Sequence, residues 1–125
     1  YENKQINVSL EKNLEINIRP NSIKRCLTNL IDNGLSYGKK IEILSNKTKK
    51  NIIIFIDDDG PGIDENEYEK VMKPFYRIDK SRSQNKSGVG LGLSIANDII
   101  RSHGGNISLE KSPLGGLRAK ISLPI

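Results

Sequence analysis

The stretch "IIIFIDDDGPGI", residues 52–63, joins five apolar residues, three consecutive carboxylates and a turn built on two glycines and a proline. An apolar run of this length that ends at a turn is typical of a buried central strand. Adjacent like charges repel, so the three acids suggest a metal ion, a positively charged ligand, or one selected acid with two solvated neighbours. The rest of the sequence decides among these possibilities.

Composition and length limit the class of protein. At 125 residues the chain has the size of one domain, and with 35% hydrophobic residues, 5% aromatic residues and no Trp its core must be aliphatic. The single cysteine, Cys26, excludes an internal disulfide and a multi-cysteine zinc site, and we expect it to be a small buried hydrophobe. No apolar run approaches the roughly 20 residues that cross a bilayer, so this piece is expected to be soluble.

The formal net charge of +5 favours an anionic partner. Lysines occur in small clusters, at 39–40, 47–50 and 80–86, and not in one long tract with interleaved aromatics. This distribution argues against nucleic acid as the partner. Nucleotide phosphates and a membrane surface remain as anionic candidates.

Hydrophobic periodicity and turn residues predict an ordered series of elements. The predicted strands are 5–10, 14–19, 40–46, 51–57, 106–112 and 117–124, with the first two paired as a hairpin. The predicted helices are 20–37, which starts at Pro20 and stops at Gly38, a short one over 65–72, and 91–103, which ends at a glycine pair. The sum is an α/β two-layer sandwich with about three helices over one face of a mixed sheet.

Residues 74–90 contain no periodic apolar pattern for most of their length and are rich in Ser, Lys and Arg. Loops longer than a dozen residues are uncommon inside a compact domain and are usually functional lids or disordered. This segment is therefore predicted to be a mobile lid.

The first predicted helix carries a polar stripe beside its apolar one. Asn29, Asn33 and Tyr37 follow each other at four-residue spacing and so share one face. They either form an ordinary solvated face or offer an amide oxygen to a Mg²⁺ ion that also holds phosphates. The helix by itself does not choose between these two interpretations.

Asp58, Gly60 and Gly62 form an Asp-x-Gly-x-Gly unit at the end of the central strand. The glycines would allow a flat ligand to approach the backbone, and the acid could accept a hydrogen bond from an exocyclic amine such as that of adenine. A simple polar turn and a calcium loop are the alternatives, although the Pro61 turn does not match an EF-hand.

A second glycine series, "SGVGLGLSI", leads a loop into the start of the last predicted helix. Free backbone N–H groups and the positive end of the helix dipole favour phosphate at such a site. The series is neither a Walker loop nor a Rossmann fingerprint, and a flexible hinge would need the same glycines.

Five segments of the chain resemble, in their order, the five motif boxes of the ATP-binding catalytic domain of sensor histidine kinases. They are "NLIDNGLSYG", "DDDGPGI", "KPFYR", "GVGLGLSI" and "GGLRAKISLP". The match spans the chain, and "SIKRCLTNLIDNGLSYG" is most similar to the osmosensor kinases of the EnvZ type. The resemblance implies the Bergerat-type ATP-binding sandwich shared with gyrase, MutL and Hsp90. It also implies ATP and Mg²⁺ as the cofactors.

The resemblance assigns a role to each site residue. On the first helix it gives Asn33 to Mg²⁺, Asn29 to the phosphate side and Tyr37 to packing near the adenine. It makes Asp58 the acceptor of the adenine amine, so that Asp57 and Asp59 are bystanders that point elsewhere. The other implied nucleotide-binding residues are Gly60, Gly62 and Ile63 at the base, Phe75, Arg77 and Lys80 in the lid, and Gly88, Gly90, Leu91, Gly92 and Leu93 over the triphosphate.

Two positions bear on the reaction. Ser36 stands where family members commonly carry Lys or Arg, so a phosphate contact is missing or is supplied by the lid, and ATP affinity is expected to be lower than usual. Hydrolysing members of the superfamily place a Glu at the position of Asn29 to activate water, and an amide cannot do this. The resemblance therefore implies phosphoryl transfer to a histidine on a separate dimerisation domain, which is expected to be absent from this fragment.

His103, at the end of the last predicted helix, is interpreted as a helix-terminal cation and not as the phosphoacceptor.

The resemblance also implies the setting of the domain. The expected partners are the dimerisation domain and a response regulator, and the expected location is the cytoplasmic part of a bacterial inner-membrane homodimer. The alternatives are an ATPase or serine kinase of the same fold, and a module that senses ATP without catalysis.

Overall fold

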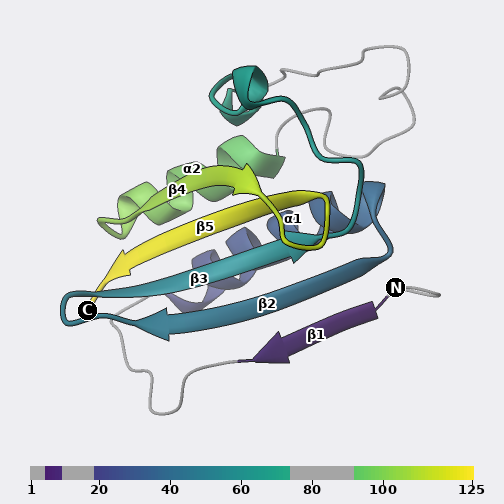
Figure 1. The fold of residues 1–125 in the computed structure, drawn as a ribbon. Helices are drawn as coiled ribbons and strands as arrows, with labels where there is room; N and C mark the ends of the chain where they lie inside the picture. The colour runs from purple at the N-terminus through teal and green to yellow at the C-terminus, as the bar shows by residue number, and fades with distance from the viewer. Residues whose placement is uncertain (1–4, 10–18, 74–91) are drawn as a thin grey trace.

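A computed structural model describes residues 5–9, 19–73 and 92–125 of the chain. Five strands form one sheet in the order β1-β2-β3-β5-β4, and two α-helices cover one of its faces (Figure 1). The strands are β1 (Gln5–Ser9), β2 (Lys40–Lys47), β3 (Asn51–Asp58), β4 (Asn106–Lys111) and β5 (Leu117–Pro124). The helices are α1 (Pro20–Tyr37) and α2 (Gly92–Ser102), with single 3₁₀ turns η1 (Glu65–Glu67) and η2 (Lys70–Met72) between β3 and α2. The predicted α/β sandwich is confirmed.

The sheet is mixed because its first pair is parallel. β1 runs parallel to β2, whereas β2, β3, β5 and β4 are joined by antiparallel ladders. The pairing of β1 with β2, two elements separated by α1, was not predicted from the sequence. The predicted partner strand 14–19 lies, apart from Arg19, outside the described residues.

The apolar run at 52–56 lies in the central strand of the sheet. β3 lies between β2 and β5, and its even-numbered residues face the helices while its odd-numbered residues face the open side of the sheet. Ile52 and Ile56 are buried on the helix side. The fully buried core is aliphatic, as the composition predicts, and consists of Cys26, Leu30, Leu35, Ile41, Ile56, Ala96, Ile100, Ala119, Ile121 and Leu123.

Cys26 lies in this core, on α1 against α2. It is fully buried, and its thiol lies 3.7 Å from the carbonyl oxygen of Ala96. Burial raises the pKa of the Cys26 thiol to about 12. The expectation that Cys26 is a small buried hydrophobe is confirmed.

Glycine ends both helices, for two different physical reasons. Gly104 adopts a φ of 81°, and the N–H of Gly105 reaches back to the carbonyl of Ile100 at 3.0 Å, which is the usual left-handed helix stop. Gly38 ends α1 in an extended conformation with φ of −118°. It must be glycine because a Cβ there would lie 2.5 Å from Oδ1 of Asp59 and 2.9 Å from the amide nitrogen of Gly60.

Two predicted elements differ in detail. The helix expected over 65–72 is two separate 3₁₀ turns, η1 and η2, of three residues each. Residues 65–67 contain no buried side chain, so this segment lacks the apolar stripe that stabilises a longer helix. The last helix, α2, ends at Ser102, one residue before the predicted end, and the predicted start at residue 91 lies outside the described residues.

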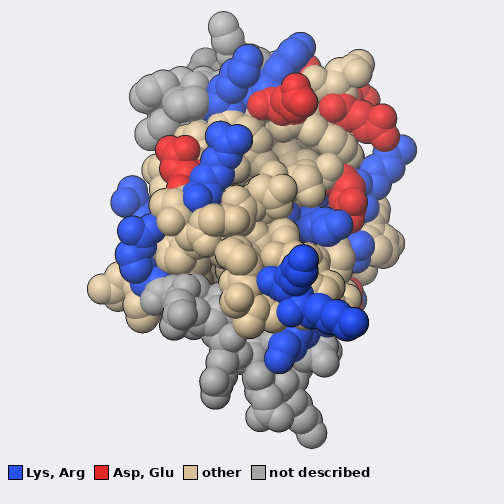
Figure 2. All heavy atoms as spheres, turned by 90° about the vertical axis from the view of Figure 1, so that its left-hand side faces the viewer, with Lys and Arg blue, Asp and Glu red and all other residues tan. Residues whose placement is uncertain are grey.

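The turn between β2 and β3 lies at the end of the sheet that faces the viewer in Figure 2. Lys47, Lys49 and Lys50 are exposed there. Basic and acidic side chains are mixed over this side of the molecule, with several basic ones grouped at the lower right. In the part of the chain that is described, no helix is long and apolar enough to cross a membrane.

Candidate functional site

Asp58 is the last residue of β3 and is buried on the helix side of the sheet, with 8% of its surface exposed. Its Oδ1 accepts hydrogen bonds from the backbone N–H of Gly60 at 2.9 Å and of Leu117 at 3.1 Å. Burial raises the pKa of the carboxyl, and the two backbone hydrogen bonds only partly oppose this effect. Asp58 is thus a buried, oriented acceptor at the end of the central strand.

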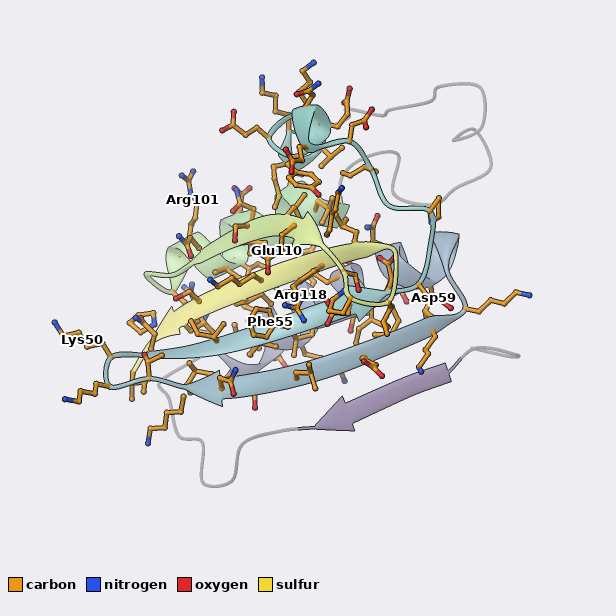
Figure 3. The ribbon with its side chains drawn as sticks, in the orientation of Figure 1. Lys50, Phe55, Asp59, Arg101, Glu110 and Arg118 are labelled. Atoms are coloured by element: carbon orange, nitrogen blue, oxygen red, sulfur yellow. The ribbon has the colours of Figure 1, made fainter. Side chains whose placement is uncertain are left out.

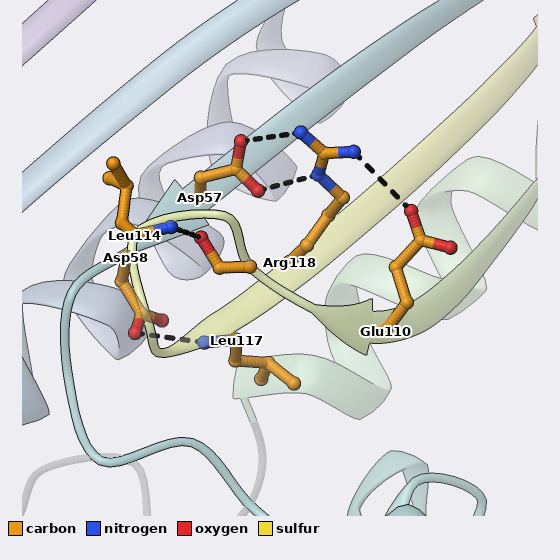
Figure 4. A network of polar contacts seen from close by, with 7 residues as sticks. Asp57, Asp58, Glu110, Leu114, Leu117 and Arg118 are labelled. Atoms are coloured by element: carbon orange, nitrogen blue, oxygen red, sulfur yellow. Dashed lines mark hydrogen bonds and ion pairs between the residues drawn. The ribbon is translucent and has the colours of Figure 1, made fainter.

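The turn between β4 and β5 packs on Asp58, which sequence reasoning did not predict. Ser112 is buried and organises the turn: its Oγ accepts from the N–H of Leu114, and its N–H donates to the carbonyl of Gly116. Leu117, the next residue after the turn, supplies one of the two donors to Asp58 (Figure 4). The glycine pair before Leu117 was the sequence signal, but its partner lies almost 60 residues earlier.

Asp57 is buried and paired, so it is not one of the solvated neighbours that the sequence allowed, while its lack of a contact with the nucleotide stays a prediction. Asp57 is 1% exposed and forms a bidentate ion pair with Arg118, with Nε to Oδ1 at 2.7 Å and a terminal guanidinium nitrogen to Oδ2 at 3.0 Å. Its side chain does point away from Asp58, because neighbours along a strand alternate faces. A buried carboxylate needs such a partner, and Arg118 sits opposite it on β5.

Asp59 has a third and separate role. Its Oδ1 accepts from the backbone N–H of Lys39 at 2.8 Å and of Lys40 at 3.0 Å, at the start of β2. These hydrogen bonds lower the pKa of the Asp59 carboxyl. The three acids are therefore held by three different partners, which rules out one metal ion gripped by all of them.

Helix α1 brings the predicted amide stripe to the same end of the sheet. A Cβ placed on Gly34 would lie 3.3 Å from Cβ and 3.5 Å from Oδ2 of Asp58, so the helix backbone beside Asn33 rests against the Asp58 side chain. Asn29 and Asn33 are both half-buried. The Asn29 amide nitrogen is buried and has no hydrogen-bond partner in the described part of the chain. The side chain of Tyr37 lies outside the described residues.

An unpaired buried donor costs free energy, so its presence points to a ligand. An amide N–H donates to an oxygen atom, and a phosphate oxygen is a suitable acceptor. The residues present therefore fit a nucleotide on this side of the sheet.

The glycine turn after Asp58 is also brought to the site. Gly62 adopts a φ of 73°, which favours glycine, and a Cβ there would lie 3.5 Å from the carbonyl oxygen of Gly116. Gly60 and Ile63 are half-buried. The two glycine turns of the sequence, at 60–62 and 115–116, thus pack against each other.

The predicted lid residues Phe75, Arg77, Lys80, Gly88, Gly90 and Leu91 lie outside the described residues. Gly92 is the first residue of α2, and the Leu93 side chain is half-buried and packs against the core. A contact of Leu93 with a triphosphate through its backbone stays a prediction.

Ser36 and His103 both contact backbone groups of the described residues. The Oγ of Ser36 donates to the carbonyl of Asp32 at 2.9 Å, one helical turn earlier. His103 Nδ1 lies 2.8 Å from the carbonyl of Ile99, and its Nε2 accepts from the backbone N–H of Arg19 at 3.0 Å. His103 thus joins the end of α2 to Arg19, the residue before α1, and its role as a helix-terminal cation stays a prediction.

These features define an α/β sandwich with a candidate nucleotide-binding site between α1 and the end of β3. Residues 18–125 match the family described as histidine kinase-, DNA gyrase B-, and HSP90-like ATPase. The chain belongs to this family, and its domain is of the histidine kinase ATP-binding type.

Several relatives are similar in sequence. The chain is 43% identical to the sensor histidine kinase CpxA of Escherichia coli over 107 residues, which cover 85% of this chain and 23% of that protein. It is 41% identical to the signal transduction histidine-protein kinase ArlS of Staphylococcus aureus over 113 residues, which cover 88% of this chain and 25% of that protein. The chain thus spans about a quarter of the length of these relatives.

Solved structures of histidine kinase domains are similar to this chain in fold. The histidine kinase domain of the Escherichia coli osmosensor EnvZ has a TM-score of 0.73 at 32% identity and covers 100% of this chain and 78% of that one. The ATP-binding domain of PrrB from Mycobacterium tuberculosis has a TM-score of 0.77 at 29% identity and covers 99% of this chain and 82% of that one.

Proposed function

We propose that this domain binds Mg²⁺-ATP and transfers the γ-phosphoryl group to a histidine on a separate dimerisation domain, within a two-component signalling protein. The family and the similarity to sensor histidine kinases support this function. Two features of the candidate site support the proposal, a buried carboxylate that could accept from the base and the amides of α1 that could contact the phosphates.

Base recognition is assigned to Asp58. Its Oδ1 is occupied by two backbone donors, and no hydrogen bond to Oδ2 is found among the described residues. An oriented carboxylate oxygen with spare capacity can accept from the amine of adenine, and it cannot pair with a keto group at the same position of the base. The domain is therefore expected to prefer ATP over GTP.

The phosphates and Mg²⁺ are assigned to α1. Asn33 would hold the metal through its amide oxygen, and Asn29, one turn earlier, would donate its unpaired N–H to a phosphate oxygen. When bound, Mg²⁺ neutralises charge on the phosphates. Ser36 stands in place of the usual basic residue. The negative charge of the phosphates that Mg²⁺ does not neutralise is therefore left to the basic residues of the lid.

The Asn29 amide is the single observation that carries phosphoryl transfer over hydrolysis. A carboxylate at this position could take a proton from water, but an amide has no basic site at neutral pH. What remains is positioning and electrostatic stabilisation of the transferred group. An external nucleophile, the histidine, completes the reaction.

The test is to incubate the chain with γ-labelled ATP and a separately supplied dimerisation domain. Label that appears on the dimerisation domain as acid-labile phosphohistidine supports the kinase. Steady release of phosphate supports an ATPase of the same fold, acid-stable phosphoserine supports a serine kinase, and neither product supports an ATP-sensing module. The chain by itself is expected to bind ATP without becoming labelled.

The metal assignment has its own test. Asn33→Ala is expected to abolish or sharply weaken Mg²⁺-dependent nucleotide binding in calorimetry, with Asn46→Ala, an exposed asparagine on β2, as the control. Wild-type affinity in Asn33→Ala would refute the assignment.

The setting of the domain is part of the same proposal. We infer that the domain lies on the cytoplasmic side of a membrane homodimer. We also infer that a separate response regulator receives the phosphoryl group. Osmotic stress as the stimulus is supported by the 32% identity with the osmosensor EnvZ and by nothing in the site. A reporter for the cognate response regulator, followed through osmotic shifts, tests the stimulus.

A further inference from the structure

The ladder between β3 and β5 ends beside the proposed base acceptor. Its last backbone pair is Asp57 with Arg118, and the residues that follow this pair are Asp58 and Leu117. The N–H of Leu117 donates to the side chain of Asp58 at 3.1 Å. The alignment of Asp58 therefore depends on how firmly the two strands are held at their last pair.

Side chains hold that last pair on the open face of the sheet. Figure 3 shows Arg118, Phe55 and Glu110 together on this face, away from the helices. The Arg118 guanidinium donates hydrogen bonds to both carboxylate oxygens of Asp57. Its central carbon, Cζ, lies 4.2 Å from the centroid of the Phe55 ring. A third partner, Glu110 on β4, lies 3.6 Å from the remaining guanidinium nitrogen.

This arrangement fixes the guanidinium in one geometry. Asp57 is 1% exposed and the Arg118 side chain 18%, so the pair is largely shielded from solvent. The hydrogen bonds to Asp57 raise the pKa of Arg118 above its already high ordinary value. A planar guanidinium that forms two hydrogen bonds with a carboxylate fixes the orientation of the two groups as well as their separation. A lysine ammonium fixes only the separation.

We propose that Arg118 is a positioning residue for base recognition, which it performs by holding Asp57 so that the adjacent Asp58 carboxylate is aimed at the adenine amine. This inference rests on the proposed function of Asp58. Asp57 and Asp58 are consecutive and point to opposite faces, so a shift of Asp57 moves the backbone that carries Asp58. Arg118 holds the strand end from the open face, while Leu117 holds Asp58 from the helix side (Figure 4).

The expected consequence is a change in selectivity, because a small misplacement of an acceptor weakens the hydrogen bond it forms with the ligand. Contacts of α1 with the phosphates do not depend on Arg118. Loss of the ion pair should therefore weaken ATP binding more than the binding of a nucleotide that lacks the amine. A general loss of structure would weaken both nucleotides alike.

The experiment compares affinities for Mg²⁺-ATP and for purine riboside triphosphate, which lacks the 6-amino group, by calorimetry with the 125-residue chain. The main variant is the double replacement Asp57→Leu with Arg118→Met. Exchange of a buried ion pair for apolar residues of similar volume is often neutral or stabilising. The second variant is Arg118→Lys, which keeps the positive charge but cannot form the two parallel hydrogen bonds of a guanidinium.

Lys120→Gln is the matched control, since Lys120 lies two residues further along β5 on the same open face and carries the same charge. The ratio of the two affinities is expected to fall about tenfold in the double variant, the scale of one hydrogen bond to a charged group. Arg118→Lys should lower the ratio in the same direction, and Lys120→Gln should leave it unchanged.

The outcomes separate the two proposals. A wild-type ratio that is retained in a folded double variant, or in Arg118→Lys if the double variant does not fold, overturns the positioning role and leaves the proposed function intact. A wild-type chain that does not distinguish the two nucleotides overturns the assignment of Asp58 itself. Thermal unfolding of each variant shows whether a change in ratio accompanies a loss of structure.

Discussion

Gly116 lies directly against Asp58, so that a Cβ atom at position 116 would overlap the Asp58 carboxylate and approach the amide nitrogen of Gly60 to 2.7 Å. These residues are 58 positions apart in the sequence and meet because β5 lies next to β3. The close approach explains why the turn into β5 contains a glycine that the local backbone does not require, since only Gly115 of this pair has a positive φ. Gly116 is needed by the site, and Gly115 by the turn.

Alanine at these two positions should therefore have different effects. Gly116→Ala is expected to displace Asp58, abolish measurable ATP binding and cost about 1–3 kcal/mol of stability from overpacking. Gly115→Ala has open space around its Cβ but a φ of 100°, so it should cost about 1–3 kcal/mol through backbone strain and leave ATP affinity nearly unchanged. Denaturant unfolding and calorimetry measure the two quantities, and equal losses of ATP affinity would contradict this division.

Asp58→Asn should separate stability from function. Because the folded-state pKa of Asp58 is raised above 3.8, the folded chain binds this proton more tightly than the unfolded chain does. The carboxylate then lowers stability as pH rises through its folded-state pKa, and the loss is complete above it. We expect Asp58→Asn to be at least as stable as wild type at neutral pH, with the difference shrinking toward acid pH, and to bind ATP much more weakly.

Thermal unfolding of the nucleotide-free chain across pH 3 to 8 checks the stability part of this prediction. Asn46→Asp, an exposed change on β2, controls for the effect of one unit of net charge. A Tm for Asp58→Asn that lies below wild type at neutral pH would show that the carboxylate stabilises the fold.

Asp59 should show the opposite pH dependence. Its folded-state pKa is lowered below 3.8 by the N–H groups of Lys40 and Lys39, so its contribution to stability is fully present above the unfolded-state pKa. It is lost as pH falls through the folded-state pKa. Asp59→Ala should therefore lower the Tm at neutral pH, and the gap to wild type should close in strong acid. Parallel curves for the two proteins would exclude an ionised role for Asp59.

His103→Ala should destabilise the domain without affecting phosphoryl transfer. The substitution removes two hydrogen bonds, to Ile99 and from Arg19, which contribute about 2 kcal/mol together. Ser102→Ala, which removes an exposed hydroxyl that contacts Arg19 from the same helix end, is the milder comparison. Urea unfolding and a transfer assay with a supplied dimerisation domain test this, and loss of transfer in a folded His103→Ala chain would contradict the structural role.

Elements whose signals are local in the chain could be predicted from the amino-acid sequence. Apolar periodicity and turn residues predicted α1 at about the observed bounds and β2, β3, β4 and β5 to within one residue, because burial on one face repeats along each element. The composition predicted an aliphatic core with Cys26 inside it. The ordered glycine and acid motifs indicated the family, and the position of Asp58 at the end of the central strand followed from the apolar run before it.

The partners of these elements and side chains depend on the folded arrangement of the chain. The parallel pairing of β1 with β2, the bidentate pair of Asp57 with Arg118 and the hydrogen bond from Leu117 to Asp58 all join segments that are distant in sequence. Three adjacent acids look equivalent in a sequence, since spacing shows only which face each one points to. Their charges acquire separate roles because the folded chain brings a different donor to each: Arg118 to Asp57, two backbone amides to Asp58, and the start of β2 to Asp59.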